Sequence, residues 1–104
     1  MAFFDFGKRI VIDAFAQTLA SDLAKRYPVA LELDPTKKRN PSRLTKAFDS
    51  TFNRAINFQL EHKLGIYGKA KLSAAFKDEL KELGYPDDFV DLATSAMTKF
   101  LGSN

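Results

Sequence analysis

The chain has 104 residues, of which 45 % are hydrophobic and 28 % are charged, and its formal net charge is +3. These values are ordinary for a soluble globular protein, and the length fits a single domain over residues 1–104. Because the sequence contains no cysteine, it excludes disulfides, thiolate nucleophiles, cysteine-based zinc sites and iron–sulfur clusters.

The N-terminal segment is only partly apolar, since Asp5, Lys8 and Arg9 interrupt its hydrophobic residues. This pattern does not match a secretory signal peptide. The longest uncharged stretch, residues 14–21, is far shorter than the roughly 20 residues that span a bilayer. We therefore expect a cytoplasmic protein with no membrane partner.

The first predicted helix covers residues 7–26 and ends at Tyr27-Pro28. Apolar side chains recur along it at intervals of three and four, the pattern of one buried helical face: Val11, Ile12, Phe15, Ala16, Leu19, Ala20 and Leu23. After this helix, Val29, Leu31 and Leu33 alternate with other residues. The alternation predicts a short extended segment over residues 29–33.

The second predicted helix covers residues 41–63 and is the most clearly amphipathic part of the chain. Asn40 is a favoured N-cap residue, and Pro41 is favoured at the first helical position. At the other end, we expect Gly65 to adopt the left-handed conformation that closes a helix and Ile66 to fold back onto it.

Two further helices are predicted, over residues 69–83 and 86–101. Gly84 ends the first of them, and Pro86, Asp87 and Asp88 begin the second, where acidic side chains are favourable. The sequence therefore predicts an all-α fold: a compact bundle of about four helices with an extended connection between the first and the second.

A run of cations surrounds the predicted start of the second helix, with no acid between residues 35 and 48. Positive charge opposes the helix dipole at this end, so an anion would complete the electrostatics. Arg and Asn side chains further along the helix are of the types that contact base edges. The candidate anion or nucleic-acid site comprises Lys37, Lys38, Arg39, Arg43, Lys46 and Arg54. The alternative is an ordinary solvated basic surface.

Several apolar residues fall outside the predicted buried faces. They form a candidate protein interface, since aromatic residues are enriched where proteins meet: Phe3, Phe4, Phe6, Ile10 and Leu60. The alternative is that the three N-terminal phenyl rings cover the bundle.

No sequence motif supports catalysis, a cofactor or a metal. The chain lacks a glycine-rich phosphate loop, a nucleophile elbow and a zinc-protease motif. His62 is its one histidine, and an enzyme built around it is the weakest of three hypotheses. The leading hypothesis is a non-enzymatic, regulatory or accessory helical interaction module that self-associates as a homodimer. The second is a nucleic-acid-binding protein that uses the basic start of the second helix.

Overall fold

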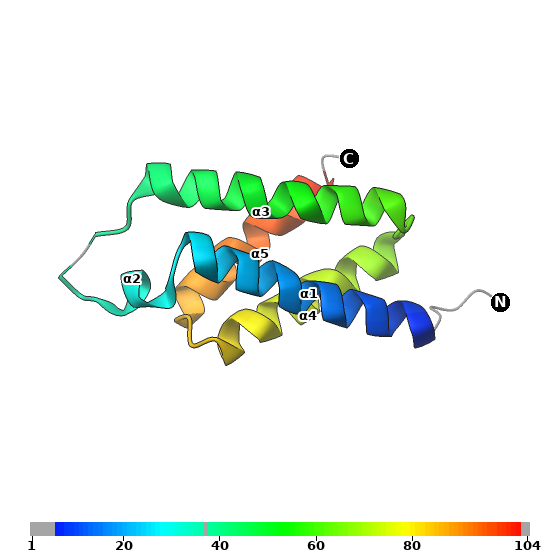
Figure 1. Cartoon of the computed structure of the whole chain (residues 1–104), viewed down its shortest axis with the longest axis horizontal. Coiled ribbons are helices and arrows are strands. Elements are labelled where there is room, and N and C mark those ends of the chain that lie inside the picture. The colour runs from blue at the N-terminus through cyan, green and yellow to red at the C-terminus, as the bar shows by residue number, and fades with distance from the viewer. Residues whose placement is uncertain (1–5, 37, 103–104) are drawn as a thin grey trace.

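The protein is a helical bundle, as the sequence predicts. The structure is a computed structural model that describes residues 6–36 and 38–102. Within these ranges five helices form: α1 (Phe6–Arg26), α2 (Val29–Leu33), α3 (Pro41–Glu61), α4 (Ile66–Glu82) and α5 (Asp87–Gly102) (Figure 1). The all-α fold class is confirmed.

The four long helices form a ring in which α1 packs against α3 and α4, and α5 packs against the same two helices. Contacts between α1 and α3 show that these helices are antiparallel, because Phe15 stacks on Phe58 and Asp22 binds Arg54. By contrast, α1 and α4 run in the same direction (Figure 1). The consecutive helices α3 and α4 are therefore not neighbours in the bundle but lie on opposite sides of it. Their backbones are close together only at the loop that connects them.

The core is built largely on phenyl rings. Phe52 lies at its centre and makes edge-to-face contacts with Phe76 of α4 and Phe100 of α5, at centroid distances of 5.7 and 5.4 Å. Phe48 stacks on Phe52 within α3, and it also contacts Phe89 at the start of α5. Seven of the ten phenylalanines in the sequence belong to this core or pack against it.

The start of α3 follows the prediction, but its end differs. The side chain of Asn40 accepts a hydrogen bond from the backbone N–H of Arg43 at 3.1 Å, so Asn40 is the N-cap. The helix ends at Glu61, two residues earlier than expected, and Lys63 takes the left-handed conformation with φ of 52°. The prediction that Gly65 does so is wrong, since Gly65 is extended.

Hydrogen bonds explain this shift. The N–H of Leu64 donates to the carbonyl of Gln59, and the N–H of Lys63 donates to that of Leu60. This pair of bonds is the Schellman motif, and it buries Leu64 as the residue that folds back. Ile66 begins α4 instead, three residues before the predicted start of that helix.

The end of α4 uses the same motif in the predicted place. Gly84 has a φ of +96°, and the N–H of Tyr85 donates to the carbonyl of Leu80. Such a φ favours glycine, because other residues meet steric conflict there. α5 then begins at Asp87, with Asp87 and Asp88 in its first turn.

The predicted extended segment over residues 29–33 is wrong, because these residues form the short helix α2. A five-residue alternation is also compatible with one helical turn, and no strand among the described residues is present to pair with this segment. A helical turn satisfies its own backbone groups. Val29 and Leu31 pack against the core, whereas Leu33 is exposed.

Candidate functional site

The cations of the candidate anion site do not all lie together, since Arg39 borders a different hollow from Arg43, Lys46 and Arg54. Lys37 lies outside the described residues. Lys38 and Lys46 are exposed, and no hydrogen bond or ion pair is found for either of them within the described part of the chain. Arg43 is exposed and directs its Nε toward the carbonyl of Arg26, at the end of α1, at 3.3 Å. Arg39 and Arg54 are both paired with acids.

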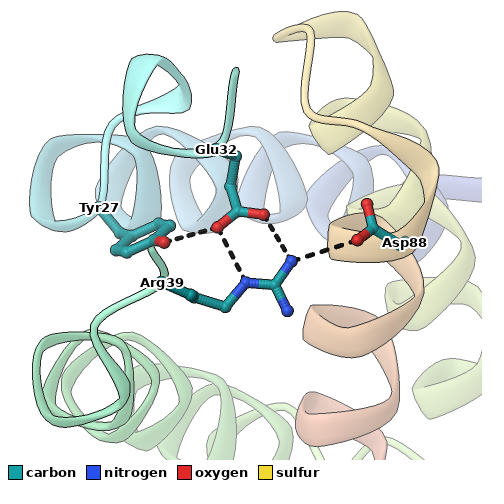
Figure 2. Close-up of polar contacts among 4 residues, drawn as sticks. All are labelled: Tyr27, Glu32, Arg39 and Asp88. Atoms are coloured by element: carbon teal, nitrogen blue, oxygen red, sulfur yellow. Dashed lines mark hydrogen bonds and ion pairs between the residues drawn. The ribbon is translucent and has the colours of Figure 1, made fainter. Parts of the chain in front are cut away.

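Arg39 belongs to a polar cluster that we name the Glu32 network, formed by Tyr27, Glu32, Arg39 and Asp88 (Figure 2). Its Nε and Nη2 donate to the two carboxylate oxygens of Glu32 at 2.9 and 2.6 Å. Its Nη2 also lies 3.3 Å from Asp88 at the start of α5. The hydroxyl of Tyr27 donates to Glu32 at 2.6 Å.

Glu32 reaches this position because it belongs to the helical turn of α2. Through Arg39 and Asp88, the network links the connection between α1 and α3 to the start of α5. The side chain of Glu32 is 5 % exposed and that of Arg39 is 37 % exposed. Charge-assisted, two-point bonds of this kind are among the stronger polar contacts in proteins. The charge of Arg39 is therefore already paired with acids of the same chain.

Ionisation in the Glu32 network follows from its contacts. The hydrogen bonds from Arg39 lower the pKa of Glu32 below its usual 4.5, although burial acts in the opposite direction. The same pair raises the pKa of Arg39. Burial, with the hydrogen bond to Glu32, raises the pKa of Tyr27 to about 12. Burial also raises the pKa of Tyr85, whose hydroxyl donates to the carbonyl of Tyr27, to about 12.

Arg54 belongs to a second cluster, centred on Asp22 of α1. The carboxylate of Asp22 accepts hydrogen bonds from Arg26 at 3.0 Å, Thr51 at 2.8 Å and Arg54 at 3.1 Å. Burial of the carboxyl group opposes ionisation, but the bonds from Arg26 and Thr51 and the two positive charges outweigh it and lower the pKa of Asp22. The carboxylate of Asp22 is thus shared by two arginine side chains.

His62 occupies the C-cap of α3, and its ring packs against Phe58. Its Nε2 lies 3.6 Å from the carboxylate of the neighbouring Glu61. Within residues 6–36 and 38–102, no group of three histidine or acidic side chains is arranged to hold a metal ion. In the same ranges, no helix has both the length and the apolar composition needed to cross a bilayer.

The candidate protein interface is described only in part. Phe3 and Phe4 lie outside the described residues, as does the side chain of Phe6. Ile10 and Leu60 are 54 % and 57 % exposed. Ile10 belongs to the beginning of α1 and Leu60 to the end of α3, and these two helix ends lie at the same end of the molecule (Figure 1).

The most exposed apolar residues at this end are two that the sequence analysis did not assign to an interface. Ile66 and Tyr67 are 85 % and 83 % exposed. With Leu60 they form what we name the apolar tip. The diverging helices explain this exposure, because no part of α3 or α4 covers the vertex between them. The sequence contained one signal, two large apolar residues between glycines in Gly65-Ile66-Tyr67-Gly68.

A groove adjoins the apolar tip, between the start of α4 and the end of α5. It has a volume of about 530 Å³, and Ile66, Ala70 and Leu101 contribute to its mainly apolar walls. Lys69 is the charged residue in the wall, and its Nζ lies 3.4 Å from the carbonyl of Leu101. Since Ile66 belongs to both features, the tip and the groove are continuous.

Comparisons with models of known protein families, with curated proteins and with solved structures gave no match for this chain.

Proposed function

We propose that this protein is a non-enzymatic interaction module that self-associates, with the apolar tip of one copy entering the groove of another. The observation that carries the proposal is the continuity of a protruding apolar tip with an apolar groove on one end of the molecule. A two-fold interface requires a self-complementary surface. The apolar tip and the adjoining groove provide one, because the tip of each copy can enter the groove of the other.

One pair of opposite charges stands beside the two features. Glu61 stands next to Leu60 of the apolar tip and is exposed, and Lys69 stands in the groove wall. A tip that enters the groove of a second copy brings these opposite charges together twice. Opposite charges across an interface fix its register and disfavour other arrangements.

The area involved is compatible with a modest interface. A specific interface buries about 800 Å² on each partner. An aromatic side chain alone can bury roughly 150–250 Å², and Tyr67 is almost fully available. Ile66, Leu60 and the groove wall add to this area. We therefore expect a dimer of micromolar rather than nanomolar stability.

Sedimentation velocity over a range of protein concentrations tests the proposal. Burial of one aliphatic side chain contributes roughly 1.5–3 kcal/mol, and in a two-fold dimer Ile66 is buried twice. Because 1.4 kcal/mol changes an equilibrium constant tenfold, Ile66→Ser should raise the dissociation constant by a factor on the order of a hundred or more.

Leu33→Ser provides the matched control, since Leu33 is also an exposed apolar residue but lies in α2, at the other end of the molecule. It should leave the dissociation constant unchanged. A wild-type protein that stays monomeric at high micromolar concentration, or a dimer that Ile66→Ser does not weaken, would refute the proposal.

A further inference from the structure

Two neighbouring hollows follow the line where α1 and α3 meet. The larger, of about 630 Å³, lies between the end of α1 and the start of α3, and Arg26, Arg43 and Lys46 contribute to it. The smaller, of about 410 Å³, includes Lys25 and Arg54. We name the two hollows together the basic seam, and these five residues are its cations. Arg39 lies in neither hollow.

The basic seam has a strong excess of positive charge. Of the residues that form its two hollows, Asp22 is the one acid, and it is already bound by Arg26 and Arg54. The other polar members are uncharged donors and acceptors, among them Ser21, Ser42 and Ser50. Five cations and one acid leave the seam with four positive charges.

The ligand-facing groups are side chains from two helices rather than the N-terminus of α3. Pro41 has no N–H, and the Asn40 side chain occupies the N–H of Arg43. Lys25 and Lys46 are exposed, with no hydrogen bond or ion pair to another described residue, so their ammonium groups are available. Along α3 the seam extends from Ser42 to Arg54, which corresponds to about 18 Å at 1.5 Å per residue.

We infer that the basic seam binds the phosphodiester backbone of nucleic acid, without reading its sequence. Phosphates follow one another at about 3.4 Å along each strand of a duplex, so a seam of this length faces several of them. The residues that form the two hollows include no aromatic ring among the described residues. Single-stranded DNA binders stack bases on aromatic rings, and the seam offers contacts for phosphates instead. This inference does not depend on self-association.

Fluorescence anisotropy with a labelled duplex of random sequence tests the inference. The wild-type protein should bind at low salt, and the logarithm of its affinity should fall with the logarithm of salt concentration with a slope of about −3 to −4, as expected for about four phosphate contacts. A second duplex of unrelated sequence should bind equally well. Absence of binding at low salt overturns the inference.

Matched double variants locate the site. Lys25→Ser with Lys46→Ser should weaken binding at least tenfold and reduce the salt slope by about 2, one for each lost phosphate contact. Lys8→Ser with Lys81→Ser removes the same charge from two positions outside the hollows and should bind like the wild type. Equal losses in both double variants overturn the assignment to the seam.

Asp22→Asn provides a test by gain of binding. It removes the seam's one acid and releases Arg26 and Arg54, so affinity should rise severalfold at low salt if the seam is the site. An unchanged affinity in the folded variant, checked by circular dichroism, argues against it. Isothermal titration calorimetry with tripolyphosphate is the final control. Tight binding of this ion without binding of either duplex overturns the assignment to nucleic acid.

Discussion

Replacing Arg39 by Met tests whether the Glu32 network stabilises the connection between α1 and α3. The substitution keeps much of the side-chain volume but leaves the Glu32 carboxylate, which is 5 % exposed, without its cation. Breaking a fully buried ion pair by removing one partner costs about 3–5 kcal/mol. Because Arg39 itself is 37 % exposed, water already weakens the attraction, and we expect a loss of about 2–3 kcal/mol.

Urea denaturation followed by far-UV circular dichroism measures this loss. For a domain of this size the unfolding free energy falls by about 1–3 kcal/mol per molar urea, so a loss of about 2–3 kcal/mol should lower the midpoint by roughly 0.7–3 M. Glu32→Gln removes the buried charge together with the pair and should cost less. The double variant should be as stable as Glu32→Gln alone, which would give a coupling energy equal to the cost of Arg39→Met, about 2–3 kcal/mol.

The dependence on pH follows from the lowered pKa of Glu32. Its contribution to stability is present above about pH 4.5 and is lost as the pH falls through the lower pKa of the folded state. The Arg39→Met defect should therefore shrink in acid, where the unpaired carboxyl becomes protonated. A defect within about 0.5 kcal/mol, typical of a surface substitution, or strictly additive single costs, would refute this reasoning.

Three further predictions concern helix ends and buried tyrosines. Lys63→Gly should raise the free energy of unfolding by about 1 kcal/mol, because a non-glycine residue is strained at a φ of 52°. Gly84→Ala should lower the free energy of unfolding by about 1–2 kcal/mol for the same reason, at a φ of +96°. Changes of the same sign for the two variants in urea titrations would contradict the left-handed conformation of residues 63 and 84. In a Tyr67→Phe background, near-UV absorbance should show Tyr27 and Tyr85 ionising near pH 12 rather than pH 10. Between pH 10 and pH 12 a tyrosine ionises in the unfolded chain but not in the folded protein, so the free energy of unfolding should fall by up to about 2.7 kcal/mol for each tyrosine. Ionisation of both tyrosines near pH 10 in the folded protein would contradict their burial.

The long helices were predictable from the sequence because their signals are local. Apolar residues at helical spacing mark the buried face of α1, and Asn40-Pro41 and Gly84 act through the backbone of their immediate neighbours. The end of α3 misled the prediction because Lys63 takes a position that usually belongs to glycine. The Schellman hydrogen bonds of Leu64 and Lys63 decide that end, and residue type alone does not indicate them.

The candidate sites were less predictable because they depend on how distant segments meet. The pairing of Arg39 with Glu32 requires the helical turn of α2, and an extended segment would have placed Glu32 elsewhere. The basic seam includes Lys25 and Arg26, which join Lys46 only because α1 and α3 are antiparallel neighbours. The exposure of Ile66 likewise results from the diagonal placement of α3 and α4.

The parallel contact between α1 and α4 has a consequence for synthesis on the ribosome. Asp13 meets Lys71, and the carbonyl of Tyr27 meets the hydroxyl of Tyr85, so partners along this contact are separated by 58 residues. A nascent chain that ends before α4 lacks one of the two helices against which α1 packs. Since contacts between distant segments slow folding, the chain should collapse into its native packing only late in translation, and a fragment lacking α4 and α5 should be prone to aggregate.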